Sequence, residues 1–158
     1  MTPTEIQDGL FEISRHIREG GQEVQPMVFL LTSEGVIQMP LFLDKSLWRV
    51  AILTLIKETQ ASAIILTVEA WGVFGKKAGE AVASKLAGLE SLQDFPGRVE
   101  ILQSQMECLD GSTRTLRASI SPEGKLGATD VDTSTECDGD LVGFFKDAFP
   151  SSGQVAIA

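Results

Sequence analysis

The sequence predicts an α+β fold: a single domain in which helices pack on one mixed or antiparallel sheet. Three observations predict it. The chain opens with apolar residues at helical spacing, two short apolar runs joined by a tight turn follow, and the later half contains segments that alternate like strands. The expected order is helix, hairpin, helix, long strand, helix and antiparallel meander.

Length and composition favour one globular domain. The chain has 158 residues, of which 43% are hydrophobic and 22% charged, which is ordinary for a protein with its own core. We expect this domain to span residues 1–150. The small residues at 151–158 are expected to form a flexible tail.

The first helix is expected over residues 1–20. Its apolar residues recur at spacings of four, three and four and predict one buried stripe, formed by Ile6, Leu10, Ile13 and Ile17. Gly20 and Gly21 are expected to end the helix.

A hairpin is expected next, with Ser33-Glu34-Gly35 as a three-residue loop. This loop would set the register of the two strands and bring apolar side chains together on one face, which we expect to be buried. The expected pairs are Thr32 with Val36, Leu31 with Ile37, Phe29 with Met39, and Met27 with Leu41.

A second helix, capped by Asp44 and running to about Gln60, is expected to cover the hairpin. Its apolar surface would consist of Leu47, Trp48, Ala51, Leu55 and Ile56. The β-branched run at 62–74 then predicts a central strand covered on both sides. Residues 76–93 are expected to form a helix, with a loop as the alternative.

A second hairpin is expected from residue 98 onward, with Asp110-Gly111-Ser112 as its loop. That loop would pair Met106 with Leu116, Ser104 with Ala118, and Leu102 with Ile120. Alternation along its first strand directs Leu102, Ser104, Met106 and Cys108 to the core and Gln103, Gln105 and Glu107 to solvent. A short strand at 125–131 and an apolar segment at 141–145 follow.

Charge and reactive residues exclude several classes of function. The net charge of −9 disfavours nucleic acid and anionic membranes as partners. A single histidine, His16, and two distant cysteines cannot supply the ligands of a zinc enzyme. We expect His16 either at the surface or in helix packing, and Cys108 and Cys137 reduced and inert. No secretory leader or membrane-length apolar run is present, which favours a cytoplasmic protein.

An acidic segment near the C-terminus is the sharpest local feature. It contains Asp130, Asp132, Glu136, Asp138 and Asp140, with no Lys or Arg from 126 to 145. The glycine and glutamate positions of an EF-hand loop are absent. Two interpretations stay open: a solvated acidic loop, or a hard-cation site formed by Asp130, Asp132, Asp138 and Asp140. No cofactor is predicted, and a divalent cation is the alternative.

Glu69 lies within the apolar central strand, on the face of Ile65, Thr67 and Trp71. A carboxylate there must be paired or exposed. Arg98 would give a structural ion pair, whereas Glu100 would give two carboxylates able to share a proton or a metal. The ion pair, or simple exposure, is the expectation.

Short motifs resemble a family of uncharacterised bacterial proteins: Glu69-Ala70-Trp71, then Pro96-x-Arg98-x-Glu100, then Asp110-Gly111. The resemblance covers about residues 26–127 and implies no known activity or cofactor. It singles out Glu69, Trp71, Arg98 and Glu100 for inspection.

Two functions are compatible with these patterns. The first is a non-catalytic association module that works through a sheet edge or an apolar surface. Its partner would be a second copy, most simply as a homodimer, or another protein, with Phe144, Phe145 and Phe149 as candidate interface residues. The alternative is a small divalent-cation-dependent enzyme or ligand-binding protein that uses the acidic segment.

Overall fold

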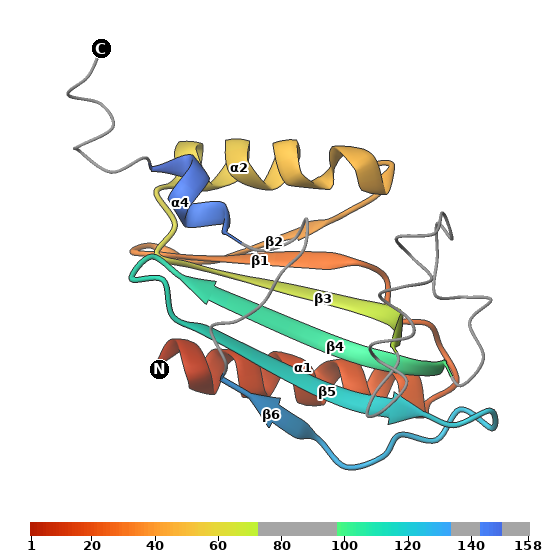
Figure 1. Ribbon diagram of the computed structural model, residues 1–158. Coiled ribbons are helices and arrows are strands. Elements are labelled where there is room, and N and C mark those ends of the chain that lie inside the picture. Colours follow the sequence, from red (N-terminus) through yellow and green to blue (C-terminus); the bar gives the residue numbers. More distant parts are fainter. Residues whose placement is uncertain (73–97, 134–142, 150–158) are drawn as a thin grey trace.

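A six-stranded antiparallel sheet organises the protein, in the order β2-β1-β3-β4-β5-β6. The computed structural model describes residues 1–72, 98–133 and 143–149. Helix α1 covers one face of the sheet, and α2 and α4 cover the other (Figure 1). The predicted α+β class is confirmed, with every neighbouring strand pair antiparallel.

The described elements follow the predicted order. In sequence they are α1 (Pro3–Glu19), β1 (Met27–Thr32), β2 (Gly35–Pro40), a 3-10 turn (Lys45–Leu47), α2 (Trp48–Thr59), β3 (Ala63–Gly72), β4 (Val99–Cys108), β5 (Thr113–Ile120), β6 (Asp130–Asp132) and α4 (Phe144–Ala148). The helix expected at 76–93 and the tail expected at 151–158 lie outside the described residues.

The first hairpin has a tighter loop than predicted. Thr32 pairs with Gly35, so the loop contains two residues and the whole register moves by one. Gly35 adopts a φ of 136°, which side-chain-bearing residues rarely reach, and this lets the strand begin one residue earlier.

The predicted burial of β2 is wrong. Val28 and Leu30 of β1 are fully buried under α2, but most of β2 is exposed. The reason is position in the sheet: α2 packs over the apolar residues of β1 and β3, and β2 lies beyond them at the edge. Met39 contacts this core from its rim.

Helix α2 confirms the second predicted helix. The Asp44 side chain accepts a hydrogen bond from the backbone N–H of Ser46 and caps the 3-10 turn that leads into the helix. The core contains Trp48, Ile52 and Ile56, whereas Leu47 points outward. The central strand β3 is covered on both faces, as predicted, with Ile64 facing α2 and Ile65 facing α1.

Helix α1 begins as predicted but buries a different stripe. Thr2 and Glu5 form a capping box at its start. The buried residues are Gln7, Phe11 and Ser14. Of the predicted stripe, Ile6 and Leu10 pack against the core, whereas Ile13 and Ile17 are exposed.

The second hairpin turns one residue earlier than predicted, because the backbone N–H of Cys108 donates to the carbonyl of Ser112 and leaves residues 109–111 as the loop. Ser104 pairs with Leu116 rather than Ala118, and Met106 pairs with Arg114, so the register differs by two. A shift of two preserves the faces, since side chains alternate with a period of two. Leu102, Ser104 and Met106 are therefore buried as expected.

The prediction for Glu107 is wrong. This side chain was expected in solvent but is only 5% exposed. Its two carboxylate oxygens accept hydrogen bonds from the backbone N–H groups of Gly143 (2.9 Å) and Phe145 (3.0 Å). Glu107 thus holds the first turn of α4 against β4, a contact between residues far apart in sequence.

We predict that Gln7→Leu destabilises the fold by about 1–3 kcal/mol, because it leaves buried polar groups unpaired. The Gln7 amide N–H groups lie 3.1 Å from the Ser104 carbonyl and 3.0 Å from the Arg114 carbonyl, and its oxygen accepts from Arg114 at 3.0 Å. Urea denaturation measures the change. Glu12→Gln, on the exposed side of α1, is the control and should leave stability within about 0.5 kcal/mol. Equal stability of the two variants would contradict a structural role for Gln7.

Candidate functional site

The four positions singled out by sequence gather where β3 ends and β4 begins. Trp71 lies directly across from Glu100, and Glu69 lies across from Leu102. Strand alternation places Glu69, Trp71 and Glu100 on one face, which is the face that α1 covers. The region is therefore assembled from two strands and the C-terminal end of α1.

Glu69 is paired, but not with the residue we expected. Its carboxylate lies 3.3 Å from Arg18 Nε and accepts a hydrogen bond from the backbone N–H of Val24 at 3.0 Å. Arg18 also lies 4.0 Å from the carboxylate of Glu100. One guanidinium from α1 therefore separates the two carboxylates, where sequence had suggested Arg98 or a shared proton.

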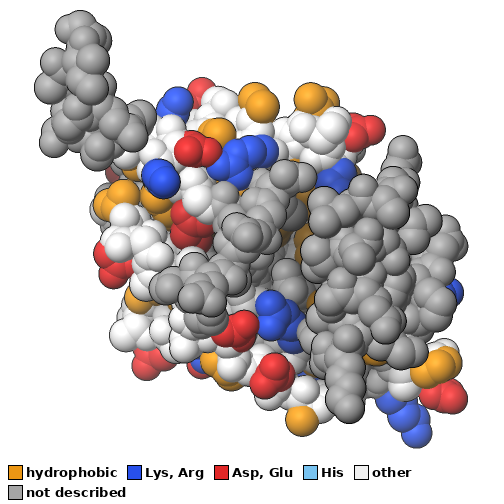
Figure 2. Space-filling model, in the orientation of Figure 1, with side chains coloured by type: hydrophobic (Ala, Val, Ile, Leu, Met, Phe, Trp, Pro, Cys, Tyr) orange, Lys and Arg blue, Asp and Glu red, His pale blue; other side chains and the backbone are white. Residues whose placement is uncertain are grey.

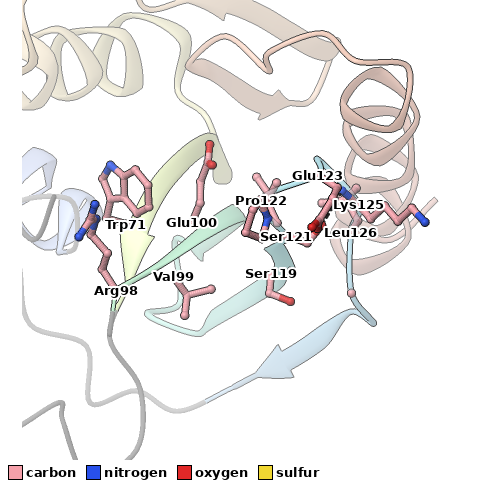
Figure 3. A pocket seen from close by; sticks show the side chains of 12 residues that line it. Trp71, Arg98, Val99, Glu100, Ser119, Ser121, Pro122, Glu123, Lys125 and Leu126 are labelled. Atoms are coloured by element: carbon pink, nitrogen blue, oxygen red, sulfur yellow. Dashed lines mark hydrogen bonds between the residues drawn. The ribbon is translucent and has the colours of Figure 1, made fainter. Parts of the chain in front are cut away.

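Arg98 makes a different contact. Its guanidinium lies 5.1 Å from the centre of the Trp71 ring, within range of a cation–π interaction, as the close-up shows (Figure 3). Adjacent strands bring these two side chains together because β3 and β4 are antiparallel neighbours at this end.

A pocket of about 690 Å³ opens beside this group. Its wall is formed by Trp71, Arg98 and Glu100 on one side and by the turn after β5 on the other (Figure 3). That turn is held by the Ser121 hydroxyl, which accepts from the backbone N–H of Lys125 at 3.0 Å. Arg98 and Glu100 are both engaged within the chain, so the pocket alone indicates no ligand class.

The acidic segment is only partly described. Asp130 and Asp132 form β6, and Asp132 lies 3.5 Å from Arg117 of β5. Asp138 and Asp140 lie outside the described residues. In the parts of the chain that the structure describes, no three His, Cys, Asp or Glu side chains come together as metal ligands do.

The candidate interface residues near the C-terminus lie inside this chain's own core. Phe144 and Phe145 are only 1% and 3% exposed and pack in the cluster formed with α2. Phe149 is half-buried and stacks on Phe145, with ring centres 6.5 Å apart. These side chains stabilise the position of α4.

Several exposed apolar side chains instead belong to the segment of the chain that runs from β2 into α2. Phe42 is 84% exposed and Val50 is 65% exposed. The other members of this group, which we call the β2–α2 patch, are Val36, Ile37, Leu43 and Leu47. Sequence analysis missed the patch because it placed β2 in the core. Elsewhere, on the described part of the face in Figure 2, charges of both signs are interspersed.

Comparisons with models of protein families, with curated proteins and with solved structures find no match for this chain. Among the described helices, none is long and apolar enough to cross a membrane. His16 is exposed on α1, as expected.

We predict that Arg18→Met lowers the free energy of unfolding by about 1–3 kcal/mol, because it removes the guanidinium that lies between the carboxylates of Glu69 and Glu100. A double-mutant cycle with Glu69→Gln should give a coupling of at least about 0.5 kcal/mol. Glu19→Gln breaks the exposed Arg15–Glu19 pair and is the control, with an expected change below about 0.5 kcal/mol. Additive effects of the Arg18 and Glu69 substitutions would show that their contact contributes nothing.

We predict slow alkylation of Cys108 by iodoacetamide at pH 8. Burial raises the pKa of this thiol above its ordinary value, so less of the reactive thiolate is present. The rate, measured by mass spectrometry in a Cys137→Ser background, should rise as the pH increases and as urea unfolds the chain. A native rate equal to the unfolded rate would contradict protection by burial.

Proposed function

We propose that this protein is an association module that pairs with a second copy of itself through the β2 edge of its sheet. The observation that carries the proposal is a contrast between the two edges. Strand β2 has six residues, Gly35–Pro40, and none of them is charged. Strand β6, at the other edge, has three residues, of which Asp130 and Asp132 carry charge.

This contrast matters because an edge strand exposes unpaired backbone groups. Proteins that keep an edge unpaired commonly make it short or charged, as β6 is. Strand β2 has neither protection, and its only proline, Pro40, stands at its end. An uncharged edge also lets two copies approach without local repulsion, although each carries a net charge of −9.

Hairpin geometry indicates which groups would pair. The two residues that flank a two-residue loop form a hydrogen-bonded pair. Along the two strands, hydrogen-bonded pairs then alternate with pairs that are not hydrogen-bonded to each other. Gly35, Ile37 and Met39 therefore bond to β1, and the backbone groups of Val36 and Gln38 point outward. Pro40 also faces outward by this alternation, and it has no N–H to donate.

If a two-fold axis passed between the Ile37 residues of two copies, the outward backbone groups of Val36 and Gln38 would form hydrogen bonds between the copies. Val36 of each copy would then pair with Gln38 of the other, and the two Ile37 side chains would lie opposite each other. The surface area buried by strand pairing alone would be smaller than the roughly 1,600 Å² that a stable protein interface buries. The β2–α2 patch continues directly from the strand and supplies further apolar surface, with Phe42 as its most exposed member.

We predict that Ile37→Lys makes the protein monomeric. Two lysines opposite each other at the axis would repel, and the dissociation constant should rise at least about tenfold. Sedimentation velocity over a range of concentrations measures the change. Val131→Lys is the matched control, because Val131 is 50% exposed on β6 at the other edge, and this variant should dimerise like the wild type.

Two results would contradict the proposal. A monomeric wild type at high micromolar concentration would exclude self-association. A dimer that Val131→Lys breaks and Ile37→Lys leaves intact would place the interface elsewhere. Circular dichroism of each variant checks that it is folded.

A further inference from the structure

Helix α4 depends on the surface beneath it. It has five residues, Phe144–Ala148, too few for a helix to persist alone in water. Its helical shape must therefore come from contacts with the rest of the chain. These contacts are of two kinds, polar ones to Glu107 and Arg49 and apolar ones along one side.

The polar contacts come from β4 and from α2. Glu107 of β4 accepts hydrogen bonds from the backbone N–H groups of Gly143 and Phe145, and its side chain is buried. Arg49 of α2 pairs with Asp147. The Glu107 carboxylate lies at the N-terminus of the helix, the positive end of its dipole.

The apolar contacts recognise two adjacent phenylalanines. Phe144 and Phe145 enter the cluster that contains Ile52 and Ile56 of α2. The Arg49 guanidinium also lies 5.1 Å from the centre of the Phe144 ring. Arg49 therefore contacts both an aromatic and an acidic residue of the segment.

We infer that this surface is a peptide-binding site that the chain's own C-terminal segment occupies. We call it the α4 site and define it by Arg49, Ile52, Ile56 and Glu107. Its ligand is a short helical segment with the pattern Gly-Phe-Phe-x-Asp, bound as an amphipathic helix is bound in a groove. The occupant from outside would be the same segment of a second copy, exchanged between chains.

The inference does not rest on the β2 edge. Segment exchange uses the opposite end of the chain and different residues. Attachment to the same chain gives the resident segment a high effective concentration, so a free peptide should bind poorly to the wild type. Weakening the resident segment should open the site to the peptide.

The test uses the full-length chain with Phe144→Ala and Phe145→Ala, and the capped peptide GFFKDAF, which corresponds to residues 143–149. The peptide should raise the melting temperature of this variant in a concentration-dependent way, because it binds the folded state. Calorimetric titration should give one site per chain. A peptide with alanine at both phenylalanine positions is the matched control and should have no effect.

A third substitution identifies the site. Adding Glu107→Gln to the double variant should weaken peptide binding at least about tenfold, since it removes a charged acceptor of two N–H groups. Glu58→Gln, on the exposed side of α2, should leave binding unchanged. If the double variant does not fold, Phe145→Ala alone serves in its place.

A folded variant that shows no stabilisation at millimolar peptide would overturn the inference. So would binding that is equal for the two peptides, or that Glu107→Gln leaves unchanged. Peptide binding can be measured whether or not the protein dimerises through β2. Its outcome therefore does not depend on the β2 proposal.

Discussion

The structure depends on the burial of β3 on both of its faces. The run from Ala63 to Val68 has almost no polar side chain, so neither face of this strand can be left in water. One face requires α1, and the other requires α2. The other strands lie outward from this centre, and none of the helices in the described residues covers the outermost strand on one side, β2.

Much of the architecture could be predicted because the spacing of apolar residues and the presence of turn-forming residues can be recognised within a short stretch of sequence. The order of the described elements, the Asp44 cap of the 3-10 turn before α2 and the two-sided burial of β3 all follow from such signals. Register was harder, since one residue more or less in a loop moves a whole strand. Gly35 decides the first hairpin through its backbone angle, which spacing alone did not indicate.

The polar contacts within the core could not be predicted, because each joins residues far apart in sequence. Gln7 binds β4 and β5, Arg18 reaches Glu69 from α1, and Glu107 meets the start of α4. Sequence motifs did single out Glu69, Trp71, Arg98 and Glu100 for inspection, and strand pairing places Trp71 directly across from Glu100. It could not indicate that Arg18, rather than Arg98, neutralises Glu69.

The unequal edges have a consequence for the size of any assembly. A sheet with two permissive edges can add copies without limit and grow into a fibre. Here the short, acidic β6 blocks growth on one side. Pairing at β2 would consume the permissive edge of both copies at once, and the twelve-stranded sheet that results would present a β6 at each end. The limit on the number of copies in the assembly would then follow from the structure of the single chain.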